Sequence, residues 1–184
     1  MIIGITGTIG AGKGTVVEYL DHKGFTHCSV RDFLRAELAL RGLVHDRDAM
    51  FALANELRQS HGPAYIMEQL YADAIESGKD AVIESIRNVG EVAYLKSKPG
   101  FHLIAVDADR KTRYERAILR GSSTDTISYE KFCEQEDAES TGTDPWMQNL
   151  PACMKEAEVV FHNDGTFEEL RQQVDAYLDK IERT

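Results

Sequence analysis

A glycine-rich loop near the start of the chain constrains its fold more than any other segment. The loop runs Gly7-Thr8-Ile9-Gly10-Ala11-Gly12-Lys13-Gly14-Thr15. The apolar run Met1–Ile5 before it predicts a fully buried strand. After it, apolar residues predict the buried side of a helix: Val16, Val17, Tyr19 and Leu20. A strand, a glycine-rich loop and a helix in this order are the context that makes a phosphate-binding loop credible.

Each residue type in this loop has a physical reason. Glycines let the backbone adopt positive φ and approach a ligand without a Cβ in the way. The N–H groups then point at a polyphosphate, and the helix that begins near Gly12 adds its positive end. Lys13 supplies a mobile charge for the β- and γ-phosphates, and Thr15 supplies a hydroxyl near a metal ion. The expected nucleotide-binding residues here are Gly7, Gly10, Ala11, Gly12, Lys13, Gly14 and Thr15.

One position of the loop departs from the strict motif. That motif has Ser or Thr directly after the lysine, whereas this chain has Gly14 there and Thr15 next. The tail Gly-Lys-Gly-Thr resembles that of small-molecule nucleotide kinases more than that of GTPases. The alternative interpretation is a glycine-rich turn with a solvated lysine. The flanking strand and helix favour phosphate binding over it.

The charge of the chain limits its partners. Its 184 residues suit one α/β domain, and 42% of them are apolar, enough for a core. Lys and Arg number 21 against 31 Asp and Glu, so the formal net charge is −10. A surface this acidic argues against nucleic acid as the main partner, but it leaves room for a local basic pocket that binds nucleotides. We expect small-molecule nucleotide substrates and a monomeric protein.

The expected cellular location follows from other features. Cys28, Cys133 and Cys153 are odd in number and far apart, which favours reduced thiols over a zinc site or a disulfide framework. Met1 leads straight into a strand without a basic leader. No apolar run approaches the ~20 residues that a membrane helix needs. We therefore expect a cytoplasmic protein without a membrane partner.

Five short apolar runs predict the strands of one sheet: Met1–Ile5, Phe25–Cys28, Ala81–Ile86, Phe101–Val106 and Val159–Phe161. Helical patterns separate these runs and no tight hairpin signal joins them, so the strands should be parallel and covered on both faces. The predicted fold class is α/β, a three-layer α/β/α arrangement with a five-stranded parallel sheet. The loop makes it the type found in phosphate-loop nucleotide kinases, with a short lid.

The helices between the second and third strands form a continuous block. Ser29 and Asp32 match a capping box that opens its first helix, and Pro63 suits the start of its last. We expect a single domain over residues 1–184. Its expected parts are a core at 1–28, 80–120 and 145–184, an acceptor-binding helical block at about 29–79, and a lid at about 121–128.

Charged side chains follow the ends of the predicted strands. The ligand site of an open parallel sheet lies at the carboxyl ends of its strands, where the glycine-rich loop also begins. The residues that follow strand ends are Arg31, Glu84, Arg87, Asp107 and Asp164. Glu84 has two interpretations: it holds Mg²⁺ through water, or it is an ordinary acid at a strand end. The convergence of these residues on one edge predicts the site.

A stretch of eleven residues carries five cations: Arg110, Lys111, Arg113, Arg116 and Arg120. Arg113, Arg116 and Arg120 are spaced three and four apart and share one helix face. Because phosphoryl transfer depends on positioning and charge neutralisation, this stripe suits the phosphates of a nucleotide. The alternative is a solvated face that pairs with an acidic run further on: Glu134, Glu136, Asp137 and Glu139.

Over nearly its full length the chain resembles the adenylate kinase and nucleoside-monophosphate kinase family. Gly7–Thr15 is similar to that family's Gly-x-x-Gly-x-Gly-Lys-Gly-Thr loop. Ser29–Arg35 is similar to its Ser-Thr-Gly-Asp-Met-Leu-Arg segment, whose final arginine holds the acceptor phosphate. Glu84-Ser85-Ile86-Arg87 resembles a shortened Asp-Gly-Phe-Pro-Arg, which supplies a second arginine to that phosphate. Asn163–Thr166 resembles the turn whose backbone meets the adenine of ATP.

The resemblance implies ATP as phosphate donor, Mg²⁺ as cofactor and a role for each matching residue. The implied catalytic residues are Lys13, Arg87 and Arg120. Arg116 and Arg120 match two arginines at the base of the lid that contact the donor phosphates, and Gly165 lies in the adenine turn. The implied acceptor-side residues are Arg31, Asp32, Arg35 and Arg87, and the implied metal-site residues are Thr15 and Glu84.

Departures from the family pattern leave the acceptor open. The shortened motif lacks its proline, and Glu134–Asp137 stands where the family places further arginines. The opening Gly4–Gly10 also resembles dephospho-coenzyme A kinase, for which Asp32 would serve as the base. A third interpretation is an ATP-binding regulatory module without an acceptor. Arg35 and Arg87 together favour an acceptor that carries a phosphate, and hence a nucleoside monophosphate.

Overall fold

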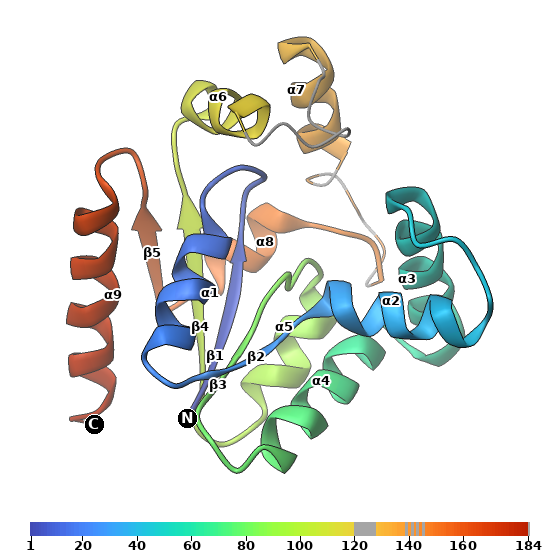
Figure 1. The fold of residues 1–184 in the computed structure, drawn as a ribbon, viewed down its shortest axis with the longest axis horizontal. Coiled ribbons are helices and arrows are strands. Elements are labelled where there is room, and N and C mark those ends of the chain that lie inside the picture. The colour runs from blue at the N-terminus through green and yellow to red at the C-terminus, as the bar shows by residue number, and fades with distance from the viewer. Residues whose placement is uncertain (120–127, 139, 141, 143, 145, 184) are drawn as a thin grey trace.

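The chain forms a parallel sheet flanked by helices (Figure 1). The computed structural model describes residues 1–119, 128–138, 140, 142, 144 and 146–183. In this part of the chain the strands are β1 (Ile2–Gly7), β2 (Thr26–Cys28), β3 (Ala81–Ile83), β4 (Phe101–Asp107) and β5 (Val159–His162). The helices are α1 (Lys13–His22), α2 (Val30–Leu40), α3 (Arg47–His61), α4 (Tyr65–Glu76), α5 (Val89–Lys96), α6 (Arg110–Leu119), α7 (Tyr129–Ala138), α8 (Leu150–Lys155) and α9 (Phe167–Ile181).

The sheet of the described residues has the strand order β2-β3-β1-β4-β5, with all neighbours parallel. β1 lies in the middle and pairs with β3 on one side and β4 on the other. The chain order therefore reverses direction across the sheet at β1, and a crevice for ligands opens at the carboxyl ends of strands around such a point. The predicted fold class, a five-stranded parallel sheet with helices on both faces, is confirmed.

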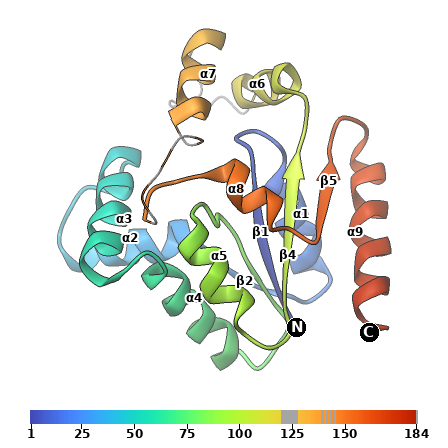
Figure 2. The ribbon, with the colours of Figure 1, turned by 180° about the vertical axis from the view of Figure 1, so that it is seen from behind.

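Alternation along β1 sends its side chains to two separate cores. Ile3 and Ile5 pack with α1 and α9, whereas Ile2 packs with the helices of the opposite face, α4, α5 and α8. Figure 2, from behind, shows α8 crossing in front of the sheet, with α5 and α4 beside it. Because both faces are covered, the strands are buried and read as apolar runs in the sequence.

The helical block α2–α4 lies to one side of the sheet (Figure 1). Ser29 caps α2 by accepting a hydrogen bond from the N–H of Asp32, as the sequence predicted, and Asp46 caps α3 in the same way. α4 begins at Tyr65, two residues later than the prediction from Pro63. Gly62, with φ 109°, ends α3, and the N–H of Tyr65 bonds to its carbonyl, so Pro63 lies in the turn before the helix.

The third strand is shorter than predicted. It ends at Ile83, because Ser85 adopts φ 64°, a conformation that non-glycine residues rarely take. Pairing with β1 resumes at Ile86, whose N–H donates to Ile5 and whose carbonyl accepts from the hydroxyl of Thr6. Glu84 and Ser85 therefore bulge out of the ladder at the carboxyl edge of the sheet.

The cysteines, the possibility of a membrane helix and the lid were the other features predicted from the sequence. Cys28, Cys133 and Cys153 form no disulfide, and burial raises the pKa of the Cys153 thiol to about 12. Among the described residues, no helix is both long and apolar enough to cross a membrane. The predicted lid at 121–128 lies outside the described residues except for Ser128, and the division into core, block and lid remains a prediction.

Candidate phosphate-binding site

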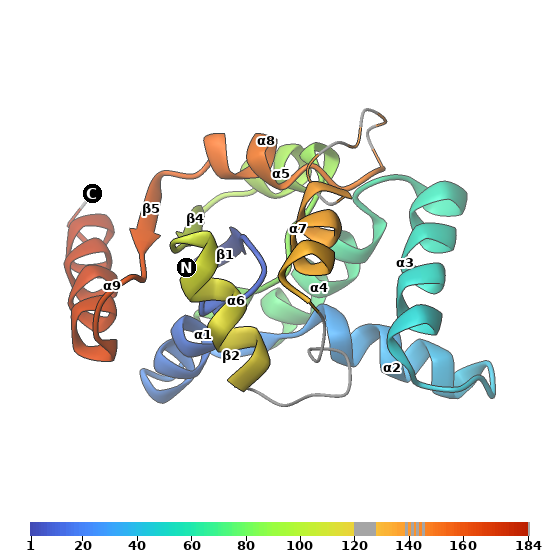
Figure 3. The same cartoon turned by 90° about the horizontal axis from the view of Figure 1, so that it is seen from above.

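The glycine-rich loop joins β1 to α1 at the carboxyl edge of the sheet, beneath α6 and to one side of α7 in the view from above (Figure 3). Gly10 and Gly12 have φ of 76° and 95°, which L side chains disfavour. A Cβ at Gly10 would lie 2.5 Å from the carbonyl oxygen of Arg113, and one at Gly12 would overlap Nδ2 of Asn163. Both positions therefore need glycine, whereas a Cβ on Gly14 would meet nothing within 4 Å.

Lys13 is the first residue of α1, and its side chain folds back over the loop. Its Nζ donates to the carbonyl oxygens of Gly7 and Thr8, each at 2.8 Å. The loop therefore holds the charge of Lys13 against its own backbone. Whether this charge serves the phosphates of a nucleotide stays a prediction.

Asn163, at the end of β5, clamps the loop, a role that the sequence did not reveal. Its Nδ2 donates to the carbonyl of Ala11 at 2.8 Å, its N–H donates to Asp107, and its carbonyl accepts from Nη1 of Arg116 at 2.6 Å. One buried residue thus joins the loop to the predicted donor-side arginine. The resemblance marked this turn for its backbone around Gly165, and the amide side chain of Asn163 carried no separate signal.

The arginine stripe of α6 divides into different environments. Arg113 is buried and donates to the carbonyls of Ala108 and Ile9 at 2.8 and 3.2 Å. Glu136 of α7 pairs with Nη1 of Arg113 at 2.5 Å and with Nε of Arg110 at 2.7 Å. The interpretation of a shared phosphate-facing stripe is therefore wrong for Arg113, which anchors α7 to the loop. The acidic run does pair with α6: the contact of Glu136 with Arg113 is buried, whereas Asp137 meets Arg110 at the surface.

Glu84 lies beside the loop with charged neighbours from three elements. Its Oε1 lies 3.4 Å from Nε2 of His27, a residue of β2. This contact lowers the pKa of the Glu84 carboxyl and raises the pKa of His27. The charges of Arg31 and Lys13 lower the pKa of Glu84 further. The structure thus brings two predicted site residues, Lys13 and Arg31, near enough for their charges to act on the ionised carboxylate of a third, Glu84.

The acceptor-side residues of α2 are more open. Arg35 and Asp32 are 50% and 72% exposed in their side chains, and Nη1 of Arg35 lies 3.8 Å from Oδ1 of Asp32. Both project from the first turns of α2, directly after β2. The structure places them at the predicted edge, with only a weak contact between them.

Arg87 leaves the sheet next to the bulge at Ser85. Its guanidinium donates through Nη1 to Oε1 of Gln148 at 3.2 Å, and its carbonyl accepts from the N–H of Asn149 at 2.8 Å. Two residues of the segment between α7 and α8, Gln148 and Asn149, thus contact the predicted acceptor arginine. Nothing in the sequence signalled Gln148, because it lies in a stretch without a recognisable pattern.

Two predicted features, the role of Arg120 and a metal site, find no direct support in the described residues. Arg120 is outside the described residues, as is most of the lid. In the part of the chain that the structure describes, no group of three or more His, Cys, Asp or Glu is placed to hold a metal ion by itself. A magnesium ion at the predicted residues, Thr15 and Glu84, would therefore need further oxygen ligands from a bound molecule.

Similarity to known proteins extends over most of the chain. A family model described as an AAA domain matches residues 3–142. The UPF0200 protein MJ1399 of Methanocaldococcus jannaschii is 30% identical over 98% of this chain and 90% of its own length. This chain belongs to the UPF0200 family. It is also 28% identical to the UPF0200 protein of Methanococcus vannielii, over 98% of this chain and 96% of that one.

Solved structures place this UPF0200 chain among phosphate-loop kinase folds. TT1252 from Thermus thermophilus superposes with a TM-score of 0.65 at 22% identity, over 98% of this chain and 97% of that one. Shikimate kinase from Aquifex aeolicus gives 0.57 at 14% identity over 98% and 97%. Dephospho-CoA kinase from Campylobacter jejuni gives 0.54 at 16% identity over 98% and 96%. At these identities the likeness shows the fold alone.

Proposed function

We propose that this chain transfers the γ-phosphoryl group of ATP to a nucleoside monophosphate or a related nucleotide. The observation that carries the proposal is the meeting of Lys13, Arg31 and Glu84 at the carboxyl edge of the sheet, beside the glycine-rich loop. A polyphosphate site needs backbone donors, a mobile cation and an acid for the metal, and this edge supplies all three.

The donor half of the site is built from the loop. Its N–H groups and the start of α1 would take the β- and γ-phosphates, and Lys13 would exchange the carbonyls of Gly7 and Thr8 for phosphate oxygens. Arg116 and Arg120 would contact the donor phosphates, and the backbone at Gly165 would meet the adenine. The bond from Arg116 to Asn163 supports this, because it holds Arg116 next to the loop.

The residues present fit a magnesium ion held jointly with a nucleotide. The Glu84 carboxylate keeps its charge because its pKa is lowered, and the Thr15 hydroxyl lies two residues after Lys13. Hard oxygen donors of this kind, few in number and completed by water and phosphate, are what Mg²⁺ accepts. When bound, the ion would neutralise charge that develops on the phosphates.

The acceptor half favours a phosphate-bearing molecule. Arg35 and Arg87 are planar guanidinium groups suited to bidentate contact with phosphate oxygens. The second candidate is a hydroxyl acceptor, as the names of the shikimate and dephospho-CoA kinase neighbours suggest. The exposed Asp32 favours it, because a carboxylate with only a weak partner at 3.8 Å is available as a base.

A panel of acceptors with ATP and Mg²⁺ separates these functions. ADP release would be measured with each nucleoside monophosphate, with dephospho-coenzyme A and with shikimate, beside the Lys13→Ala variant as a blank. We expect a monophosphate to stimulate release in the wild type only. Stimulation by dephospho-coenzyme A or shikimate alone would establish the hydroxyl candidate. ATP binding without turnover on any acceptor would contradict both and leave a regulatory module.

A further inference from the structure

A buried ion pair links the helical block to the turn that carries Arg87. Arg58 of α3 and Glu91 of α5 have side chains that are 3% and 0% exposed. Nε and Nη2 of Arg58 donate to Oε1 of Glu91, at 3.0 and 2.8 Å. A buried pair of this kind is costly to desolvate and is weak evidence for stability, so its presence calls for another reason.

The second oxygen of Glu91 holds the main chain of Arg87. Oε2 accepts from the N–H of Arg87 at 2.7 Å and from the N–H of Asn88 at 3.2 Å. The side chain of Asn88 in turn accepts from the N–H of Glu91, which completes a capping box at the start of α5. Because the carbonyl of Arg87 accepts from Asn149, the main chain of Arg87 is fixed on both sides.

The same turn is packed against the end of α3. Nδ2 of Asn88 donates to the carbonyl of Pro63 at 3.3 Å, and a Cβ on Gly90 would lie 2.7 Å from Cβ of Pro63. The end of α3 and the turn after it therefore rest directly on the start of α5. The position of Arg87 is tied in this way to the helical block that the proposed acceptor would occupy.

We propose that Glu91 and Arg58 are positioning residues that set Arg87 for the acceptor phosphate. This inference rests on the proposed function. One carboxylate divides its oxygens between the guanidinium of the block and the backbone of Arg87, so a shift of one is passed to the other. The acceptor-side arginine is thus fixed before any ligand arrives, and closure of the site is left to other elements.

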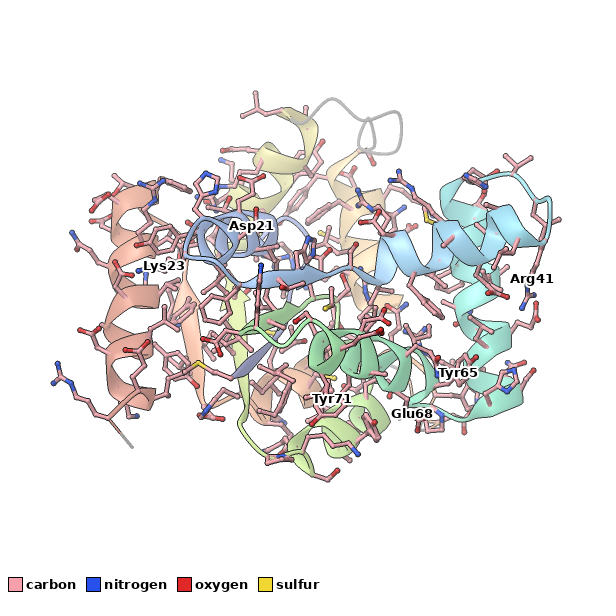
Figure 4. All side chains as sticks on the ribbon, turned by 60° about the horizontal axis from the view of Figure 1, so that its bottom comes forward. Asp21, Lys23, Arg41, Tyr65, Glu68 and Tyr71 are labelled. Atoms are coloured by element: carbon pink, nitrogen blue, oxygen red, sulfur yellow. The ribbon has the colours of Figure 1, made fainter. Side chains whose placement is uncertain are left out.

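Glu91→Gln and Arg58→Lys test this arrangement. Glutamine keeps an oxygen for the backbone N–H groups but loses the charge that pairs with Arg58, and lysine keeps the charge but loses the two-nitrogen contact. The matched control is Arg41→Lys. Arg41 pairs with Glu56 at 2.8 Å in the same block, but at its exposed outer end (Figure 4).

We expect both variants to raise the acceptor KM by about ten- to a hundredfold, because misplacement by about 1 Å from a remote change has effects of that size. The KM for ATP should stay within about twofold, and Arg41→Lys should change neither constant. A purely structural role would lower the folded fraction and reduce the apparent kcat with both KM values unchanged. That result would overturn the inference.

A double-mutant cycle makes the test specific to Arg87. If Glu91 acts through Arg87, Glu91→Gln should have no further effect on the acceptor KM in an Arg87→Met background. Effects that multiply would contradict the inference.

If the wild type turns over no acceptor, the proposed function fails, and calorimetry with AMP decides the positioning role. AMP binding that weakens in parallel in Glu91→Gln and Arg87→Met would support it. Equal binding by all variants, or by none including the wild type, would overturn it.

Discussion

The proposed donor and acceptor sides of the site are built in different ways. The glycine-rich loop is held by residues from three other parts of the chain: the buried Arg113 and Asn163 contact its backbone, and the half-buried Asp107 accepts from the hydroxyl of Thr8. The residues of α2 on the other side, Asp32 and Arg35, are half or more exposed and barely touch. The donor side is therefore an arrangement of backbone, and the acceptor side is an arrangement of surface side chains.

This difference in construction predicts how each side of the site responds to substitution. In the proposed function, a loop whose backbone is held from outside at Ile9 and Ala11 suits one kind of group, a polyphosphate, whatever the acceptor. Exposed side chains on a helix can be exchanged without loss of the fold, because surface substitutions change stability little. The contrast predicts that changes to the backbone of the loop affect fold and ATP together, whereas changes of exposed side chains on the acceptor side affect the acceptor alone.

Lys13→Ala should have the largest effect. The substitution removes the cation of the loop, and charge stabilisation of this kind is worth roughly 10²–10³ in rate. Turnover of ATP with the best acceptor should fall by that factor, measured by coupled ADP release. Circular dichroism should show an unchanged fold, because the bonds from Nζ to the carbonyls of Gly7 and Thr8 lie within the loop itself. Activity within a few-fold of the wild type would break the assignment of the donor side.

Arg35→Met should act on the acceptor and on nothing else. Loss of a hydrogen bond to a charged group costs about 1.5–3 kcal/mol, so kcat/KM for a phosphate-bearing acceptor should fall by about 10- to 150-fold. Thermal unfolding should shift by no more than the equivalent of about 0.5 kcal/mol, because the side chain is 50% exposed. A large loss of stability, or an equal rise in the KM for ATP, would show that the two sides are not built differently.

Gly12→Ala should destabilise the protein by about 1–3 kcal/mol, the usual cost of a non-glycine residue in a strained conformation. Its φ is 95°, and the new Cβ would meet Nδ2 of Asn163. Gly14→Ala is the matched control: it adds a Cβ in open space inside α1, where Ala is favoured by about 0.5–1 kcal/mol. Chemical denaturation measures both. Equal effects at the two positions would contradict the clamp on the loop.

The pair His27–Glu84 should give the smallest effect and a distinctive pH dependence. His27 has a raised pKa, so its contribution to stability is full below its ordinary value of 6.5 and is lost as the pH rises through the folded value. Glu84 has a lowered pKa, so its contribution is full above its ordinary 4.5 and is lost as the pH falls through the folded value. Both contributions are full between about pH 4.5 and 6.5.

His27→Gln should therefore lower the free energy of unfolding more at pH 6 than at pH 9, in buffer without metal. The difference should stay below about 1 kcal/mol, because His27 is 33% exposed and solvent screens the pair. Glu84→Gln should remove the same pH dependence. A variant that follows the wild type in parallel at both pH values would show that the two side chains do not interact.

Local sequence signals predicted most of the fold. The glycine-rich loop, Ser29 before α2 and Thr166 before α9 each act through hydrogen bonds within a few residues, so their spacing is visible in the chain. The strand order was not predicted, although parallel pairing was, because short apolar runs carry no information on which neighbours they choose.

The candidate site was predicted less completely, for a physical reason. Arg58 and Glu91 are 33 residues apart, and each reads as an ordinary charge on a surface helix until the fold buries both. Arg113 shared a helix face with Arg116 in the sequence, but burial against Glu136 separates their environments. Charged residues that pair across distant elements therefore escape pattern reading, whereas those at strand ends do not.

The central place of β1 has a consequence for how the chain reaches its fold. β1 is the first strand along the sequence, yet its register pairs Ile2 with Ala81 on one side and with Phe101 on the other. During synthesis this isoleucine-rich segment must wait until about residue 107 has emerged before both of its edges are covered. Such long loop closures slow folding and leave an apolar strand open to wrong partners. The sheet should therefore assemble late and cooperatively, because β1 has both edges paired only after β4 is in place.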